Sequence, residues 1–524
     1  MNMNRRNFVR GLAGVSMLGA GGCFSVGNGC DKIRMACVGA WGKGFTDWAT
    51  MLKTGQVELV AICDADADVL EKIAGHKTYK TLGVDVSRIP FYQDFRRLLD
   101  DADKLGIQAI TVSTPDHVHA PVAIRAMKMG IHVYVQKPLV RTLWELDYFN
   151  KTARENNVIV QMGNQGSSLD SMRRCTDILL SGIIGDATEV HVWTNRPVWP
   201  QGQAVANWVK GHPAGDPIKK TLAWNAWLAT AKDRPFLGEY GKNVKAYDPW
   251  KLGKNVYHRF TWRGMIDFGA GAFGDMACHT MNLAFRGLEL GPVTAAECIK
   301  IEEMNNIAYP TKSIVKMTYG ARDSKARKGV RLPPVDLYWY DGFDEARPGK
   351  SGNKPTDDVM PKVVKCFGAV PDTGCYIAGT KGAVLMRDDY GAKCAISMND
   401  EEKFVDCFEH EAAKAVPQSI AYCPGSAPVI SAGKSTVEMA GFAEGHYFEF
   451  VNAIRGIGPI HEQTHSRCFS DIEYCIPQME GILVGCIAQQ VAGKLVWDCK
   501  AQRFIGNDAA NELVKPYIRD GWRF

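Results

Sequence analysis

The residues VYVQKP, at positions 133–138, decide how the fold of this chain is interpreted. Apolar, strand-favouring side chains lead directly into a lysine, which predicts a buried parallel strand over residues 131–135. Pro138 has no N–H group to donate, so strand pairing stops there and Lys137 lies at the carboxyl end of the strand. Ligands of open α/β sheets bind at that edge. Lys137 is therefore a candidate substrate-orienting or proton-transfer group, although an isolated lysine here fits an exposed surface residue equally well.

A glycine-rich turn, GAWGKG at positions 39–44, follows a first predicted strand over residues 32–38. A helix and a second strand, over residues 57–63, complete a βαβ unit that ends in Asp64. Asp64 comes 20 positions after the last glycine of the turn, the distance at which an acidic side chain reaches the ribose hydroxyls of a dinucleotide. Trp41 occupies the place of the second glycine of the usual GxGxxG pattern. The unit predicts a dinucleotide site and favours NAD over NADP, because a carboxylate repels a 2′-phosphate.

The alternation of strands and helices between residues 32 and 163 predicts an α/β fold with a doubly wound, Rossmann-type parallel sheet. Residues 291–319 and 329–340 favour strands of a second sheet. Residues 196–260 lack periodicity and predict long loops over a site. The predicted division is a dinucleotide-binding domain over 31–165 and a second α/β domain over 166–524.

The composition excludes several classes of protein. The chain has 524 residues and a formal net charge of +5, without a stripe of basic residues, which argues against a nucleic-acid partner. No apolar run approaches the roughly 18 residues of a membrane-spanning helix. The 16 cysteines include no CxxC spacing, so we expect most of them to be small buried side chains rather than zinc ligands.

The N-terminus predicts a targeting segment. Arg5 and Arg6 precede an apolar, glycine-rich stretch at 11–22, a pattern typical of a twin-arginine export signal over residues 1–30. Because that route carries folded proteins, the pattern predicts a periplasmic protein exported with its cofactor already bound. Lipidation of Cys23 would tether the protein to a membrane surface. A disordered basic tail is the alternative for the same residues.

A second candidate segment, FGAGAFGDMACH, occupies positions 268–279. Asp275 and His279 are four residues apart in a helix predicted over 275–285, so both side chains lie on one face near its first turn. A histidine titrates near neutral pH and suits the removal of a proton from an alcohol. We expect Asp275 to orient the imidazole or to bind a substrate hydroxyl. An Asp–His pair that only stabilises the start of the helix is the alternative.

Positions 461–465 read HEQTH, which matches the HExxH pattern of zinc proteases. The pattern binds zinc only when a helix presents both histidines on one face. The glycine- and proline-containing run GIGP precedes the segment at 456–459, and the segment itself is polar. We therefore predict a loop there and no metal site.

Together these motifs resemble the Gfo/Idh/MocA oxidoreductases, the family of glucose-fructose oxidoreductase and inositol dehydrogenase. The resemblance rests on the turn at 39–44, Asp64, TPDHVH at 114–119, QKP at 136–138 and the DMACH segment at 275–279. It implies an NAD(P)-binding fold followed by an α/β domain with an open, mostly antiparallel sheet, whose last helices return toward the first domain. It also implies an active site between the two domains and a homo-oligomer, either a dimer or a tetramer.

The resemblance assigns roles to residues of this sequence. Lys137 matches the lysine that holds the reacting hydroxyl near the nicotinamide, and His279 matches the general base, with Asp275 as its partner. Gln136 replaces the glutamate of the family motif. The cofactor-binding residues implied are Gly39, Trp41, Gly42, Lys43, Gly44, Asp64, Ser113, Thr114, Pro115, Asp116, His117, His119, Gln136, Lys137 and Asn164. The candidate substrate-binding residues are Tyr257, Trp262, Arg263, Asp275 and His279.

Three functions are consistent with these residues. The leading hypothesis is an exported NAD-dependent oxidoreductase that transfers a hydride between a hydroxyl of a sugar, glycoside or polyol and a tightly held cofactor. The second is an NAD-dependent glycosidase, in which transient oxidation acidifies the neighbouring carbon and the glycosidic bond breaks by elimination. The third is a non-catalytic sugar-binding protein. Lys137 favours the first hypothesis over the second, and the set Lys137, Asp275 and His279 disfavours the third.

Overall fold

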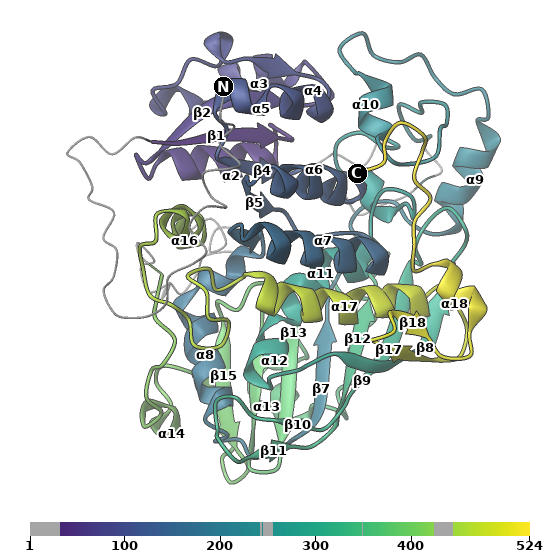
Figure 1. Cartoon of the computed structure of the whole chain (residues 1–524). Coiled ribbons are helices and arrows are strands. Elements are labelled where there is room, and N and C mark those ends of the chain that lie inside the picture. The colour runs from purple at the N-terminus through teal and green to yellow at the C-terminus, as the bar shows by residue number, and fades with distance from the viewer. Residues whose placement is uncertain (1–31, 242–243, 245–254, 348, 424–443) are drawn as a thin grey trace. The chain divides into compact units, whose positions relative to one another are not determined.

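Two β-sheets organise the described part of the chain in a computed structural model (Figure 1). The structure describes residues 32–241, 244, 255–347, 349–423 and 444–524. Apart from Lys32, all of them belong to the unit Ile33–Phe524. The export signal predicted over residues 1–30, including Cys23, lies outside the described residues.

The first sheet has six parallel strands in the order β3-β2-β1-β4-β5-β6. The chain moves outward from β1 in both directions, which is the strand order of a doubly wound dinucleotide-binding fold. The prediction of such a sheet is confirmed. The strands are β1 (Ile33–Val38), β2 (Val57–Cys63), β3 (Phe91–Tyr92), β4 (Ala109–Val112), β5 (His132–Val135) and β6 (Val160–Met162).

Helices connect these strands, and local signals set their ends. The helix before β6, α7, begins with a capping box in which Thr142 and Glu145 satisfy each other's backbone N–H groups. It ends where Asn157 adopts the left-handed conformation, with φ 48°. The helices are α2 (Lys43–Leu52), α3 (Val69–Gly75), α4 (Phe95–Asp100), α5 (Ala102–Leu105), α6 (Asp116–Lys128) and α7 (Leu143–Asn156).

The second sheet has ten strands in the order β16-β15-β14-β13-β7-β12-β9-β8-β17-β18. Every neighbouring pair is antiparallel except β7 and β12, so the predicted open, mostly antiparallel sheet is confirmed. The strands are β7 (Ala187–Trp193), β8 (Val293–Glu302), β9 (Lys312–Tyr319), β12 (Val335–Asp341), β13 (Gly374–Gly379), β14 (Gly382–Met386), β15 (Cys394–Met398), β16 (Val405–Asp406), β17 (Lys494–Asp498) and β18 (Arg503–Phe504), with a separate hairpin β10 (Arg322–Asp323) and β11 (Arg331–Leu332).

Two helices from the end of the chain contact the first sheet's helices. Helix α17 packs against both α7 and β8, and α16 packs against α2 (Figure 1). One hydrophobic core therefore includes side chains from both sheets, such as Val133 of β5, Leu337 of β12 and Met479 of α17. The remaining helices are α8 (Asp170–Leu180), α9 (Gln203–Gly211), α10 (Trp224–Leu228), α11 (Gly271–Thr280), α12 (Asn282–Gly287), α13 (Pro361–Phe367), α14 (Glu411–Lys414), α16 (Glu444–Ile454), α17 (Ile472–Ala488) and α18 (Asp508–Glu512).

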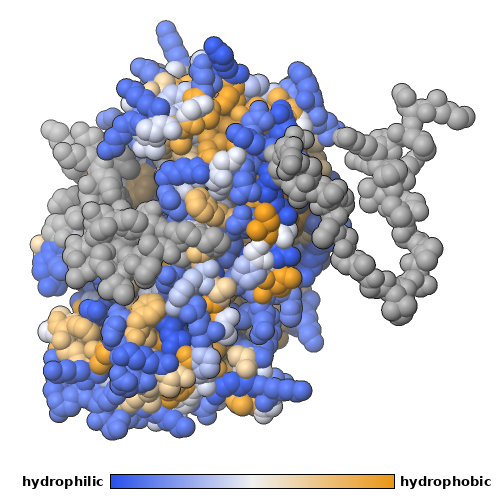
Figure 2. Space-filling view, turned by 90° about the vertical axis from the view of Figure 1, so that its left-hand side faces the viewer, coloured by the Kyte–Doolittle hydropathy of each residue, from blue (hydrophilic) through white to orange (hydrophobic). Residues whose placement is uncertain are grey.

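Hydrophilic residues cover most of the face in Figure 2, and hydrophobic residues form separate patches on it. Large apolar side chains that remain exposed include Ile299 and Ile301 of β8 and Val496 of β17. In the part of the chain that the structure describes, no helix combines the length and the apolar character needed to cross a bilayer.

Candidate active site

A cavity of about 490 Å³ lies at the carboxyl ends of β1, β2, β4 and β5. The first sheet contributes the glycine turn, Asp64, residues 113–116 and the pair Gln136 and Lys137. The part of the chain after the first sheet contributes Arg196, Arg263, Asp275, His279 and Tyr390. The cavity therefore brings Lys137 together with Asp275 and His279, which lie more than a hundred residues after it in the sequence.

Gly39 and Gly44 of the glycine turn have no room for a side chain. Gly39 has φ +81°, and a Cβ atom there would lie 2.4 Å from the carbonyl oxygen of Ser113 at the end of β4. A Cβ atom on Gly44 would lie 1.8 Å from the carbonyl oxygen of Gly39, so α2 packs directly on the turn. Residues 41–43 line the cavity, and Gly44 does not. The first turn of α2 has no side-chain cap and no acidic residue, so its free N–H groups suit a phosphate.

Asp64, at the end of β2, lines the same cavity. Its Oδ2 atom accepts a hydrogen bond of 2.9 Å from the N–H of Ala40, and Oδ1 accepts one of 3.1 Å from the N–H of Asp66. Burial raises the pKa of this carboxyl above its usual value. The crowded turn, the uncapped helix start and the acidic side chain after β2 together fit a dinucleotide.

The side chain of Asp47, on α2, is a site residue that no motif indicates. It is fully buried and accepts four hydrogen bonds. Its Oδ1 atom accepts from Lys43 Nζ at 2.6 Å and from the Tyr447 hydroxyl at 3.0 Å. Its Oδ2 atom accepts from Ser113 Oγ at 2.8 Å and from Gln136 Nε2 at 2.9 Å. One carboxylate therefore joins α2 and α16 to the ends of β4 and β5.

This network explains the amide at position 136. Gln136 donates its N–H to Asp47, and its own Oε1 atom lies 3.4 Å from the backbone N–H of Lys137. A glutamate at this position would place a second carboxyl group against that of Asp47 and would remove the N–H that Asp47 Oδ2 now accepts. The acidic group is supplied here from α2, and an amide donor is required opposite it.

Lys137 and Asp275 meet at the centre of the cavity. The ammonium group of Lys137 contacts Asp275 Oδ1 at 2.8 Å and the backbone carbonyl of the same residue at 3.0 Å. Arg263 Nε donates to the same Oδ1 atom at 3.0 Å. Burial raises the pKa of the Asp275 carboxyl, but the charges of Lys137 and Arg263 outweigh it and hold this pKa below its usual range. Asp275 is therefore an anion that fixes the position of the lysine.

Helix α11 differs from its predicted bounds. It spans Gly271–Thr280, whereas a helix over 275–285 was expected, and α12 follows as a separate helix. Gly271 has φ +64°, and a Cβ atom there would lie 2.6 Å from the ring of Tyr309, so the chain enters the helix at this glycine. As a result Asp275 lies in the second turn and His279 in the last.

His279 is 3% exposed and lines the same cavity as Lys137. Its ring packs edge-on against Tyr390, with 4.8 Å between the ring centroids. Burial, followed by the charge of Lys137, lowers the pKa of the imidazole well below its usual value, so the ring is neutral at neutral pH. Among the described residues neither ring nitrogen has a hydrogen-bond partner. The predicted orientation of this imidazole by Asp275 is thus not formed, because that carboxylate binds Lys137 and Arg263 instead.

Only part of the segment after β4 lines the cavity. Residues 113–116 line the cavity, whereas His117 and His119 do not. His117 Nε2 lies 3.2 Å from a carbonyl oxygen of α10, and burial lowers the pKa of the ring to about 3. The ring of His119 lies between two carbonyl oxygens, 2.8 Å from that of Pro138 and 3.0 Å from that of Thr114. His119 therefore holds the loop after β4 against the loop that carries Lys137.

The remaining candidate residues likewise include some that line the cavity and some that do not. Trp262 and Arg263 line the cavity. Tyr257 is 1% exposed and packs against Trp224 and Phe268, outside the lining. Asn164 lies outside it too, and its Nδ2 atom donates to the hydroxyl of Tyr474 at 3.3 Å.

Several lining residues come from loops without a recognisable motif. Arg196 follows β7 and pairs with Asp389 at 3.0 Å, and Tyr390 follows β14. His258 and Arg259 lie at the end of the cavity near Asp64. His258 contacts Asp66 at 2.9 Å, and Arg259 contacts Asp68 at 2.6 Å. The basic and aromatic run YHRFTWR at 257–263 is the sequence signal that could have indicated this part of the wall.

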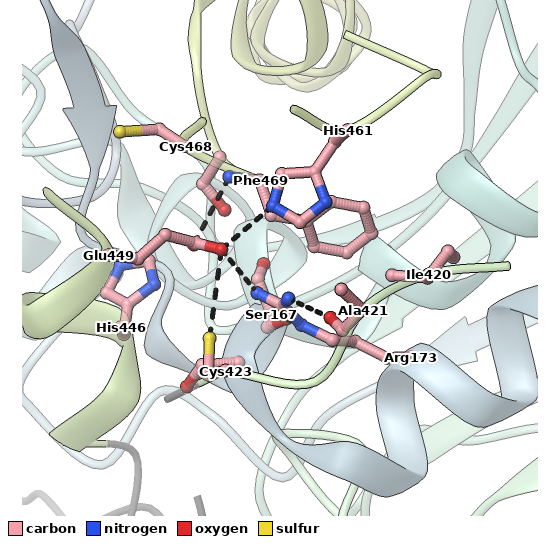
Figure 3. A network of polar contacts seen from close by, with 12 residues as sticks. Ser167, Arg173, Ile420, Ala421, Cys423, His446, Glu449, His461, Cys468 and Phe469 are labelled. Carbon is pink, nitrogen blue, oxygen red and sulfur yellow. Dashed lines mark hydrogen bonds and ion pairs between the residues drawn. The ribbon is translucent and has the colours of Figure 1, made fainter. Parts of the chain in front are cut away.

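Residues 461–465 form a turn, as predicted, and not a zinc-binding helix. Figure 3 shows His461 directed at Glu449 of α16, with 2.9 Å between Nε2 and Oε1. Glu449 also accepts hydrogen bonds from Arg173 and from the backbone N–H of Phe469. The described residues contain no group of three or more His, Cys, Asp or Glu side chains arranged to hold a metal ion.

Comparison with known proteins relates part of the chain to a protein family. A family model described as an oxidoreductase family with an NAD-binding Rossmann fold, Gfo/Idh/MocA, matches residues 33–164. Over residues 33–164 the chain is thus similar to the Gfo/Idh/MocA oxidoreductases. The resemblance inferred from the motifs, and NAD as the cofactor class, are thereby confirmed for this part of the chain.

Relatives of the Gfo/Idh/MocA segment carry several names. A curated relative from Akkermansia muciniphila, "Glycosyl hydrolase family 109 protein 2", is 26% identical over 162 residues, which are 30% of this chain and 32% of that protein. The chain thus spans about a third of the length of that relative. An inositol dehydrogenase homologue from Azotobacter vinelandii, solved with NADH and myo-inositol, has a TM-score of 0.56 at 16% identity and covers 89% of this chain and 98% of its own. The WlbA dehydrogenase from Bordetella pertussis, solved with NADH and UDP-GlcNAcA, has a TM-score of 0.52 at 14% identity. The match covers 89% of this chain and 99% of the dehydrogenase. These structural likenesses concern the fold.

Proposed function

We propose that this protein is an NAD-dependent oxidoreductase that acts on a CH–OH group of a sugar, glycoside or polyol. The observation that carries the proposal is the shared cavity. Lys137, Asp275 and His279 face the same 490 Å³ space as the glycine turn and Asp64. A nicotinamide bound there would supply reversible acceptance of a hydride from the carbinol carbon.

The residues of the chain supply the proton and charge chemistry. His279 is neutral and lacks a hydrogen-bond partner among the described residues, so it is free to accept the hydroxyl proton. Lys137 stabilises the negative charge that develops on the same oxygen. Asp275 holds Lys137 in place, and its interaction with Arg263 connects this centre to the aromatic wall of the cavity.

A segment that covers the Asp64 end of the cavity supports retention of the cofactor. His258 and Arg259 line the cavity. His258 Nε2 lies 2.9 Å from Asp66 Oδ2, Arg259 forms an ion pair with Asp68, and Lys219 contacts the same two carboxylates at 3.0 and 2.8 Å. A dinucleotide beneath these contacts would leave slowly. We therefore expect protein purified without added NAD to release nucleotide on denaturation, and a clean blank would argue strongly against the proposal.

The direct test combines a panel of sugars and polyols with the variant Lys137→Ala. The proposal expects NADH absorbance or a reduced second sugar with the parent protein, and a rate lowered by about 10²–10⁴ in the variant. Sugar binding without any hydride transfer, unchanged by the substitution, would instead indicate the non-catalytic binding protein.

A redox-assisted glycosidase is the second candidate, and the name of the Akkermansia muciniphila relative favours it. The same Lys137 and His279 would oxidise a ring carbon transiently, and the cofactor would be restored within each cycle. Release of nitrophenol from a nitrophenyl glycoside without net NADH formation distinguishes this candidate from net oxidoreduction.

We also propose export by the twin-arginine route and assembly into a homo-oligomer. The support for export is the Arg5-Arg6 pattern, and the support for assembly is the family resemblance. Fractionation of cells that express the parent chain and an Arg5→Lys, Arg6→Lys variant tests the first proposal. Light scattering of the purified protein tests the second.

A further inference from the structure

Asp116 is a buried acid of the cavity that the chemistry above leaves unused. It is the first residue of α6, it is 3% exposed, and it lines the cavity. Among the described residues its carboxyl group forms neither a hydrogen bond nor an ion pair. A buried polar group normally has a partner in the protein or in ordered water.

The other acids of the cavity region differ from Asp116. Asp47 accepts four hydrogen bonds, Asp275 binds Lys137 and Arg263, and Asp64 binds two backbone N–H groups. Each of these carboxylates holds part of the protein in place. Asp116 contacts none of these groups and lines the cavity, so its carboxyl group is open to a molecule that enters.

The surroundings of Asp116 favour the protonated acid. Burial is the largest effect on its pKa, and the nearby charge of Asp275 acts in the same direction. The cations Arg263, Lys137 and Arg141 oppose this, yet the pKa rises to about 8. The other titratable groups that face it, Tyr309, Cys278 and Cys486, are neutral at pH 7 because burial raises the pKa of each. Asp116 is therefore a proton donor beside a neutral base, His279, in one cavity.

We propose that Asp116 is a further catalytic group of this site, which protonates an oxygen atom that leaves the bound sugar. The proposal rests on the oxidoreductase function proposed above and extends it to cleavage of the oxidised sugar. A plain oxidation needs one base for the hydroxyl proton, whereas an elimination needs a base and an acid.

The step is balanced without an additional reactant. In a sugar ketone, a base removes a proton from the carbon next to the carbonyl group, and the C–H electron pair forms a C=C bond. The C–O bond on the following carbon breaks, and its electron pair stays on the departing oxygen. That oxygen takes the proton of the Asp116 carboxylic acid, which becomes a carboxylate and is protonated again by water.

The leaving group provides the test. A nitrophenolate leaves without protonation, whereas an alkoxide does not, so nitrophenyl and methyl glycosides of the same sugar form a matched pair. Holoenzyme carrying Asp116→Asn should cleave the methyl glycoside about 10²–10⁴ times more slowly than the parent, and the nitrophenyl glycoside less than about tenfold more slowly. Asp103→Asn, on the exposed surface of α5, is the matched control and should change neither rate.

A second measurement does not depend on turnover. In parent holoenzyme labelled with ¹³C at aspartate carboxyl groups, infrared spectroscopy at pH 7 should contain a protonated-carboxyl band that Asp116→Asn lacks. The difference spectrum isolates Asp116 from other buried acids. The band should disappear as the pH rises through about 8.

Any of the following four outcomes would overturn the proposal. Equal rate losses on the two glycosides, or none, would exclude acid catalysis by Asp116. Loss of bound nucleotide from Asp116→Asn would mean that the residue contacts the cofactor. Absence of the band at pH 7 would mean that the acid is ionised. If the parent protein oxidises sugars but cleaves no glycoside, this inference fails while the oxidoreductase proposal stands.

Discussion

Replacement of Gln136 by glutamate restores the residue of the family motif, and we expect it to destabilise this protein. Gln136 Nε2 lies 2.9 Å from Asp47 Oδ2, and the two side chains are 5% and 0% exposed. A carboxylate in place of the amide therefore faces another carboxylate in a buried pocket. Lys43, the nearby cation, already binds the opposite oxygen of Asp47.

The size of the effect follows from two limits. Two unit charges about 3 Å apart repel by roughly 5–6 kcal/mol at an effective dielectric constant near 20. The pair can avoid this repulsion by binding one proton, which costs about 4 kcal/mol at pH 7 for a glutamate of ordinary pKa about 4.3. The penalty at pH 7 is therefore at most about 4 kcal/mol, and at pH 5 it falls to about 1 kcal/mol.

The pH dependence has a definite sign. The introduced carboxyl has a higher pKa in the folded state than in the unfolded state, so the folded variant binds more protons. Its stability relative to the parent should fall as the pH rises from about 4.3 toward the raised pKa. Urea unfolding of both proteins at pH 5 and pH 7 measures this difference.

Two control variants complete the experiment. Gln203→Glu, an exposed substitution on α9, should have little effect at either pH. The double variant Asp47→Asn, Gln136→Glu exchanges the acid and the amide, and it should recover part of the lost stability. A single variant as stable as the parent at pH 7, or a loss that does not depend on pH, would refute the argument from Asp47.

Further predictions concern the cavity and the contacts of Glu449. Gly39→Ala should abolish nucleotide retention, because the new Cβ atom would lie 2.4 Å from a carbonyl oxygen; nucleotide absorbance after denaturation measures it. Lys137→Met should raise the pKa of His279, which the lysine charge now lowers, so the acidic limb of the pH–rate profile should move to higher pH; an unmoved limb would remove His279 as the base. In the parent protein that limb should lie well below pH 6.5, because the imidazole stays neutral there; steady-state rates between pH 5 and 8 test this. His461→Ala should lower the unfolding midpoint, since it leaves Glu449 with one partner fewer, and metal analysis of the parent should find no stoichiometric zinc.

The carboxyl edge of the first sheet could be predicted because short-range signals fix it. Pro138 shortly after β5, a turn with three glycines after β1 and Asp64 directly after β2 are each signals of local backbone conformation. The structure places all of these ends around one cavity. The family resemblance then supplied the later half of the site, because no local signal relates Asp275 to Lys137.

Side-chain partners could not be predicted in the same way. Asp47 occupies an ordinary helical position, and its importance follows from four donors that come from different elements. The start of α11 at Gly271 depends on the packing of Tyr309 against it, which a sequence pattern does not report. The missing bond between Asp275 and His279 likewise reflects competition from Lys137 and Arg263 for the same carboxylate.

The contact between α17 and α7 has a consequence for synthesis of the protein. Helix α7, residues 143–156, emerges from the ribosome well before α17, residues 472–488, which follows only after residues 157–471 have been made. The nascent chain therefore keeps an apolar flank of its first sheet uncovered until α17 has been synthesised. A fragment cut after residue 164 should be prone to aggregation, and the whole chain should melt in a single cooperative transition.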